Sequence, residues 1–246
     1  MVSSNNRANI KLIILPGWEQ CTLHWQGVVD KLQSDFEVEV IDMPGFGKEQ
    51  LISQDWEVSD YADWVKCKIE SNILYEVKKD QKLILLGHSF GGRVGHYLAC
   101  TYQPNWLKGL ILYAAPVLYR PSLLVKIQNI LTKVIDNIIP TKIIPQSWKH
   151  LFYSDDLKNS LITGKEKIFR KVVGFDQTEL LKYNKYPTVL LWGSEDRSVS
   201  VAIAKEIQQK TTNSTLVILP HEGHNIHLSN PNLFYGTLKQ ILTNNF

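Results

Sequence analysis

The sequence lacks the features that mark several common classes of protein. Its 246 residues include only three cysteines, Cys21, Cys67 and Cys100, and none of them form the Cys-x-x-Cys spacing of zinc and redox motifs. An odd number of cysteines does not make a complete disulfide framework, so reduced thiols are expected. This cysteine usage favours a cytoplasmic protein.

Long apolar runs and an excess of charge are also missing. No stretch approaches the ~18 consecutive apolar residues of a membrane span, and the polar residues 1–7 do not form the apolar core of a signal peptide. The 27 basic and 24 acidic residues leave a formal net charge of only +3, without a dense lysine or arginine run. We therefore expect no stable membrane insertion and no nucleic acid partner.

What is present is an alternation of strand and helix patterns in a chain of ordinary globular composition, with 44% hydrophobic residues. Short apolar segments predict strands at residues 11–15, 37–41, 82–87, 109–114, 188–192 and 215–219. Helical spacing follows at residues 59–79, 89–102, 201–209 and 232–242. This order predicts the α/β class, with a mostly parallel sheet of about six strands flanked by helices. Functional loops are then expected at the carboxyl ends of the strands.

One interval interrupts the alternation. Residues 117–186 contain no clear strand but show helical spacing of apolar residues, first at 123–138 and again around Phe169. We interpret this interval as a helical cap inserted into an α/β core that comprises residues 1–116 and 187–246. The insertion is too small to be a convincing independent domain.

The strongest chemical signal is a serine at a strand end. Residues 87–91 read G-H-S-F-G, a G-x-S-x-G motif that directly follows a predicted strand and opens a predicted helix. A sharp turn at this point strains the serine backbone and exposes its hydroxyl, while Gly87 and Gly91 allow strand and helix to approach closely. An ordinary glycine–serine turn is the alternative for the motif alone. Its position in the sheet predicts that Ser89 is a nucleophile.

Attack by Ser89 on an acyl carbon creates an oxyanion, which two backbone N–H groups can stabilise by roughly 3 kcal/mol per donor. One donor is expected from Phe90, the residue after the nucleophile. The other is expected from Trp18, in the loop that follows the first strand. A plain Pro-Gly turn at residues 16–17 is the alternative for that loop.

An acid and a base follow the last two predicted strands. Asp196 comes after the strand at 188–192, and His224 comes after the strand at 215–219. The chain order of serine, acid and histidine predicts that His224 takes the serine proton while Asp196 orients the imidazole. Glu195 is the nearest alternative acid.

The loop around the predicted base holds two further histidines, His221 and His227. No cysteine or second ligand cluster accompanies them, and the pattern is not the H-E-x-x-H of zinc enzymes. No metal and no other cofactor is therefore expected. We predict that His221 and His227 are surface or wall residues.

These motifs together make residues 10–246 resemble the α/β-hydrolase superfamily, most closely its small serine carboxylesterases with a helical cap. The segments that carry the resemblance are residues 15–18 (L-P-G-W), 42–47 (D-M-P-G-F-G), 87–92 (G-H-S-F-G-G), 192–196 (W-G-S-E-D) and 223–224 (G-H), followed by Pro231 and Phe234. The resemblance implies an eight-stranded core, but the chain before residue 10 is too short for the usual first hairpin. The sequence also departs from the family in having Pro16 where a histidine is usual, and Glu49 where a serine is frequent.

The resemblance implies hydrolysis of a small-molecule acyl ester or thioester through an acyl-enzyme on Ser89. Gly17, Trp148 and Phe152 are the candidate substrate-binding residues. Carbon–carbon bond hydrolysis or acyl transfer on the same catalytic residues remains an alternative, as does a ligand-binding protein on a retained hydrolase scaffold. The sequence leaves the natural substrate, the acyl-chain length and the oligomeric state open.

Overall fold

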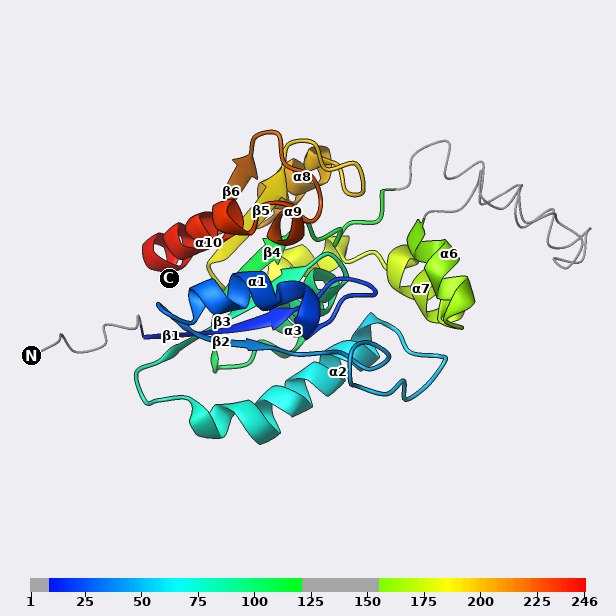
Figure 1. Ribbon diagram of the computed structural model, residues 1–246, viewed down its shortest axis with the longest axis horizontal. Coiled ribbons are helices and arrows are strands. Elements are labelled where there is room, and N and C mark those ends of the chain that lie inside the picture. The colour runs from blue at the N-terminus through cyan, green and yellow to red at the C-terminus, as the bar shows by residue number, and fades with distance from the viewer. Residues whose placement is uncertain (1–8, 121–154) are drawn as a thin grey trace, which may run out of the picture.

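The computed structural model describes residues 9–120 and 155–246, and its centre is a six-stranded sheet (Figure 1). In chain order the strands are β1 (Ile10–Leu15), β2 (Glu37–Val40), β3 (Lys82–His88), β4 (Leu107–Tyr113), β5 (Thr188–Gly193) and β6 (Ser214–Leu219). They lie in the order β2-β1-β3-β4-β5-β6, and every neighbouring pair is parallel. The predicted α/β class with about six strands is confirmed.

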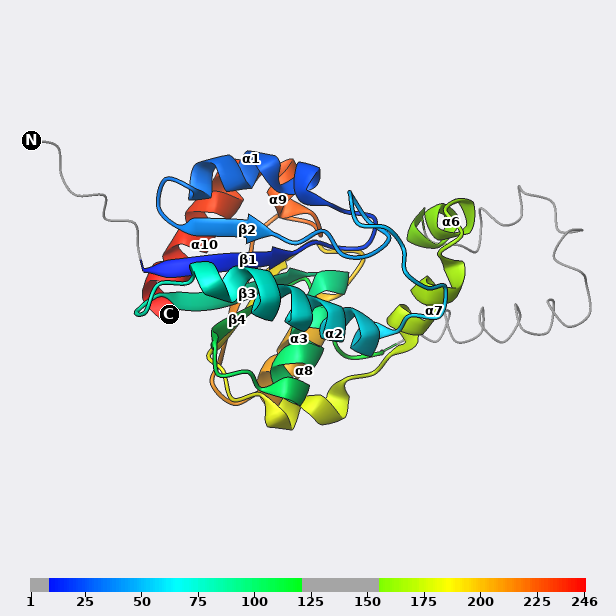
Figure 2. The ribbon, with the colours of Figure 1, turned by 90° about the horizontal axis from the view of Figure 1, so that it is seen from below.

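Helices cover both faces of the sheet (Figures 1 and 2). The helices on one face are α1 (Thr22–Leu32), α9 (Ile226–Ser229) and α10 (Pro231–Asn245). Those on the other face are α2 (Val58–Lys68), α3 (Phe90–Tyr102) and α8 (Val201–Lys210). Because helices cover both faces, the interior strand β1 is buried along its whole length. The strand β2 is half-buried, since it lies at the edge of the sheet and has a neighbouring strand on one side only.

Two helices differ from the sequence prediction. The helix α1 was not predicted, although its buried residues Trp25, Val28, Val29 and Leu32 have helical spacing. The helix predicted over residues 59–79 is shorter, because α2 ends at Lys68 and gives way to a π-helical turn and a 3-10 turn that end at Glu76. Apolar spacing alone does not distinguish these tighter and wider turns from an α-helix.

Two further helices, α6 (Asp155–Ile162) and α7 (Glu166–Gly174), lie beyond the carboxyl ends of β1 and β2 (Figure 2). They belong to the interval predicted as a cap, and together with the linking residues 163–165 we call them the α6–α7 segment. The helix predicted at 123–138 lies outside the described residues. Among the residues that the structure describes, no helix is long and apolar enough to span a membrane.

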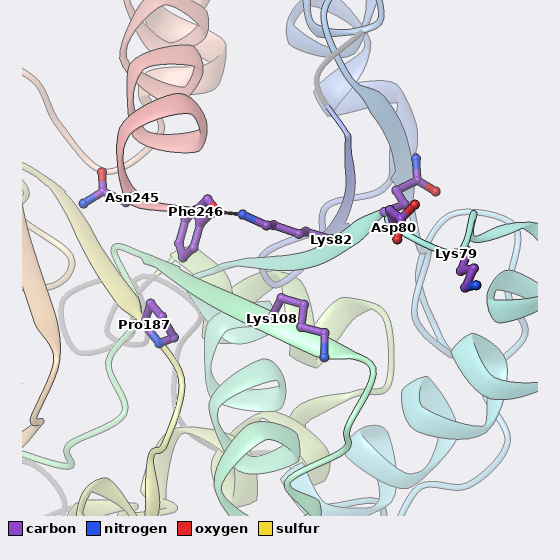
Figure 3. A pocket seen from close by; sticks show the side chains of 8 residues that line it. Lys79, Asp80, Lys82, Lys108, Pro187, Asn245 and Phe246 are labelled. Carbon is purple, nitrogen blue, oxygen red and sulfur yellow. Dashed lines mark hydrogen bonds between the residues drawn. The ribbon is translucent and has the colours of Figure 1, made fainter.

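A shallow depression of ≈ 370 Å³ lies at the amino ends of the strands, at the end of the sheet opposite to α6 and α7 (Figure 3). Lys82, Lys108 and Pro187 line it at the amino ends of three strands, and the Lys82 ammonium donates to the main-chain oxygen of Phe246. None of the predicted catalytic residues lines this depression. The predicted catalytic residues lie instead beyond the carboxyl ends of β3, β5 and β6.

Candidate active site

Ser89 lies between β3 and α3 with a backbone that few residues adopt. Its φ of 49° and ψ of −109° place this non-glycine residue at positive φ, a strained conformation. The Ser89 N–H donates to the carbonyl of Tyr113 at the end of the neighbouring strand, at 2.9 Å. The sharp strand-to-helix turn expected from the G-x-S-x-G motif is therefore present.

The glycines around Ser89 allow this turn because there is no room for a side chain. A Cβ on Gly87 would lie 2.4 Å from the Gly92 Cα, and a Cβ on Gly91 would lie 2.1 Å from the Leu15 carbonyl oxygen. Both separations are far below contact distance with main-chain atoms that cannot move aside. The predicted reason for glycine at 87 and 91 is confirmed, and it includes the carboxyl end of β1 as well as α3.

Asp196 and His224 lie together at the carboxyl ends of β5 and β6. The His224 Nδ1 is 2.7 Å from the Asp196 Oδ2, and the Asp196 side chain is completely buried. The other oxygen of this carboxylate accepts the N–H groups of Ser198 and Val199, both at 2.8 Å. These two donors fix the carboxylate in the orientation in which it faces the imidazole.

Glu195, the alternative acid, has a different partner. Its carboxylate is 3.3 Å from the Nδ1 of His221, and both side chains are exposed to solvent. Two main-chain contacts join the loops of the acid and the base: Glu195 N–H donates to the Glu222 carbonyl at 2.8 Å, and His221 N–H donates to the Ser194 hydroxyl at 2.9 Å. The geometry thus brings Asp196, and not Glu195, to His224.

Two buried side chains hold the main chain of His224 from below. The Tyr113 hydroxyl donates to the His224 carbonyl at 2.9 Å and accepts the Ile226 N–H at 2.6 Å. The His88 Nε2 lies 3.2 Å from the same carbonyl, and its Nδ1 lies 3.1 Å from the Gln20 Oε1. Sequence reasoning missed these supports, although Tyr113 and His88 both end strands, where functional side chains are expected.

The three histidines of the base loop do not converge. His221 is exposed, as predicted, but the prediction that His227 is a surface or wall residue is wrong, because its side chain is buried and stacks on Trp25 with ring centroids 4.1 Å apart. Burial, together with the nearby His224 and His24, lowers the pKa of His227 to about 3. Burial also lowers the pKa of His88 well below its usual value, with smaller contributions from His227 and His224. Both rings are therefore neutral at pH 7.

The loop after β1 approaches Ser89 from the other side. The backbone N–H groups of Trp18 and Phe90, the two predicted oxyanion donors, donate to no acceptor within residues 9–120 and 155–246. The Gly17 N–H, in contrast, donates to the Gln20 Oε1 at 3.2 Å. A Cβ on Gly17 would lie 2.7 Å from the His88 ring, so this loop packs directly on the residue before the nucleophile.

The structure describes some of the predicted site residues and not others. The indole of Trp18 and the ring of Phe90 are buried and meet edge to face, with centroids 5.3 Å apart. Trp148 and Phe152 lie outside the described residues. The structure gives no hydrogen bond between the Ser89 hydroxyl and His224, and such contacts are often long before substrate binds. The catalytic roles of Ser89, His224 and Asp196 stay predictions.

Comparisons with known proteins agree with this architecture. A family model described as the alpha/beta hydrolase fold matches residues 11–136. A pimeloyl-[acyl-carrier protein] methyl ester esterase from Wigglesworthia glossinidia brevipalpis is 24% identical over 95% of this chain and 94% of its own length. A second esterase of that name, from Aeromonas salmonicida, is 35% identical, but over only 42% of this chain and 37% of its own.

Solved structures show the same fold. An esterase from Exiguobacterium antarcticum aligns with a TM-score of 0.73 over 95% of this chain and 91% of its own, at 16% identity. A putative lipase from Acinetobacter baumannii aligns with a TM-score of 0.69 over 95% of this chain and 83% of its own, at 22% identity. These alignments show that the chain shares the fold of both structures.

Proposed function

Because the chain belongs to the α/β hydrolase fold family, we propose that it hydrolyses a carboxylic ester through an acyl-enzyme on Ser89. The observation that carries the proposal is the contact of 2.7 Å between the buried Asp196 and the half-buried His224, at the same carboxyl end of the sheet as the strained Ser89. The esterase names of the relatives support the same reaction class.

In the proposed mechanism the Ser89 Oγ attacks the ester carbonyl carbon while His224 removes the serine proton. Since Nδ1 of His224 faces Asp196, the opposite ring nitrogen, Nε2, is the one that takes this proton. The bond to the alcohol oxygen then breaks, and the alcohol leaves with the proton from His224. Water, deprotonated by His224, attacks the acyl-enzyme and releases the carboxylic acid and the free Ser89 hydroxyl.

Charge develops at two places during this reaction, and the site has a group for each. The negative charge on the carbonyl oxygen is proposed to be held by the N–H groups of Trp18 and Phe90, worth roughly 3 kcal/mol per donor. The positive charge on the His224 imidazole is held by the Asp196 carboxylate, which Ser198 and Val199 keep oriented.

The methyl ester of an acyl chain on a carrier protein is the substrate that the names of the curated relatives suggest first. We propose residues 117–186 as the cap that covers the acyl group, with residues 1–116 and 187–246 as the core. Gly17 lies in the proposed oxyanion loop and is proposed to contact the substrate.

The proposal is tested by turnover of p-nitrophenyl esters of increasing acyl length, and of monomethyl esters of dicarboxylic acids, by wild type and Ser89→Ala. We expect turnover by wild type, a loss of roughly 10³-fold or more in the variant, and a fluorophosphonate label on Ser89 of the wild type only. Wild-type protein that neither turns over any ester nor takes the label would contradict it and would favour the ligand-binding alternative.

A further inference from the structure

We propose that the α6–α7 segment positions the Trp18 N–H for oxyanion binding, and that Glu19 and Lys165 are the positioning residues that transmit this effect. The inference rests on the proposed function, because it assigns a part of the fold to the oxyanion loop of that reaction. It is carried by contacts between residues that lie more than a hundred positions apart in the chain.

The central contact is an ion pair between the oxyanion loop and the segment. The Lys165 Nζ lies 3.1 Å from the Glu19 Oε2, with side-chain exposures of 9% and 25%. The same ammonium donates to the Gly45 carbonyl at 2.9 Å and lies 4.4 Å from the centre of the Phe46 ring. A lysine so far removed from water needs these partners, because breaking such a pair leaves an uncompensated buried charge.

The ion pair acts on a residue whose backbone is strained. Glu19 has a φ of 56°, in the left-handed region that a non-glycine residue adopts only when its surroundings favour it. Its second carboxylate oxygen lies 3.2 Å from the Thr163 hydroxyl, whose single proton is shared with the Asn159 carbonyl at 2.9 Å, so both oxygens contact residues that link α6 and α7. Glu19 directly follows Trp18, and relaxation of its backbone therefore shifts the Trp18 main chain.

The Trp18 side chain is held by the same segment. Its indole Nε1 donates to the buried Ser160 hydroxyl at 2.9 Å, and that hydroxyl donates to the Asp156 carbonyl at 2.6 Å. The indole also meets the ring of Phe169 in α7, with centroids 5.2 Å apart. Trp18 thus has its indole on α6 and α7 while its N–H is directed, in the proposed mechanism, at the substrate oxygen.

A substitution in the α6–α7 segment, outside the catalytic residues, is therefore expected to change kcat through the position of the Trp18 N–H. An oxyanion contact is stronger in the transition state than with bound substrate, so a displaced Trp18 N–H lowers kcat and leaves KM nearly unchanged. Complete loss of one donor costs roughly 10²–10³-fold in kcat. A displaced donor is expected to cost less, about 10-fold.

The test compares Lys165→Met with Lys167→Met in the full-length protein. Lys167, two residues away, is exposed and pairs only with Asp55 among the described residues, so it is the matched control. Lys165→Met is expected to lower kcat about 10-fold at similar KM, while Lys167→Met stays within about 2-fold of wild type. The rates are referred to the fraction of Ser89 that takes a fluorophosphonate label, which removes the effect of unfolded protein.

Two further variants separate positioning from general damage. Lys165→Arg keeps the charge and is expected to restore most of kcat. Glu19→Gln combined with Lys165→Met is expected to cost no more than Lys165→Met alone, since both changes break one contact. The inference is overturned if Lys165→Met retains wild-type kcat, or if KM rises while kcat holds. It is also overturned if the losses in kcat of Glu19→Gln and Lys165→Met, each measured alone, add up in the double variant. Failure of the proposed function is a separate result, in which wild type itself has no ester turnover and no label.

Discussion

The two sides of the candidate site are held in place by different parts of the molecule. On the acid–base side, Asp196 and His224 are fixed by main-chain groups of the β5 and β6 loops and by Tyr113 from β4. On the oxyanion side, the loop with Trp18 and Glu19 is fixed by side chains of the α6–α7 segment. The positions of Asp196 and His224 therefore depend on the sheet and its loops, whereas the proposed oxyanion loop contacts the α6–α7 segment outside the sheet.

This difference suggests how such a site can change without losing its chemistry. Residues at the ends of strands share one rigid framework, so their mutual distances persist when a surface segment changes. An oxyanion loop tied to an insertion can instead respond to the insertion, and the insertion also covers the substrate in the proposed function. The following predictions test each side separately, from the largest expected effect to the smallest.

The largest effect is expected for the acid of the acid–base side. Asp196→Asn removes the charge that stabilises the imidazolium and is expected to lower kcat by roughly 10³–10⁴-fold. Glu195→Gln changes an exposed neighbour whose side chain, among residues 9–120 and 155–246, pairs with His221 alone; it is the matched control and should be nearly normal. Steady-state rates on one p-nitrophenyl ester compare them. A reversed result would exchange the roles of the two carboxylates.

Stability on the acid–base side should fall as the pH is lowered from neutral. His88 and His227 are buried with pKa values below 6.5, about 3 for His227, so the unfolded chain takes up protons below pH 6.5 that the native protein does not. Each such histidine makes the free energy of unfolding fall by up to about 1.4 kcal/mol per pH unit between pH 6.5 and the native pKa.

Urea unfolding at pH 7, 6 and 5 measures this dependence. His227→Gln is expected to reduce the slope of unfolding free energy against pH by up to about 1.4 kcal/mol per pH unit. An equal slope in wild type and His227→Gln would show that His227 is protonated in the native state.

A smaller effect is expected where the acid–base side is supported from the sheet. Tyr113→Phe removes the donor to the His224 carbonyl and leaves the Ile226 N–H without its acceptor. Loss of about 1–2 kcal/mol of hydrogen bonding should lower kcat about 10-fold per labelled Ser89. Steady-state kcat and its pH profile compare Tyr113→Phe with wild type. A lower stability with unchanged kcat and profile would limit Tyr113 to a structural role.

The smallest effect is expected on the oxyanion side. Ser160→Ala removes one hydrogen bond of the Trp18 indole while the ring contacts with Phe46, Phe90 and Phe169 remain. A loss of about 3-fold in kcat, without a change in KM, is expected from one neutral hydrogen bond. The exposed Ser71→Ala in the π-helical turn is a control for the same substitution. A larger loss than for Lys165→Met would make the indole, and not Glu19, the main link to α6.

The strands and the turn at Ser89 were accessible from the sequence because their signals are local. Apolar runs predicted every strand within two residues at each end, and the G-x-S-x-G motif predicted the turn at Ser89. The burial of His227 was not accessible, because its stacking partner Trp25 lies far from it in the sequence, near the other end of the chain. The supports of Trp18 were missed for the same reason, since Ser160 is 142 positions away.

The sequence by itself determined the class of fold, the order of its elements and the residue types that carry the proposed reaction. These follow from periodicity and from short motifs, in which neighbours along the chain decide the outcome. Only the tertiary structure decided which carboxylate faces His224, which histidine of the loop after β6 is buried, and that Lys165 is paired with Glu19. Those choices depend on the burial of charge and on contacts across the fold, and no local pattern encodes them.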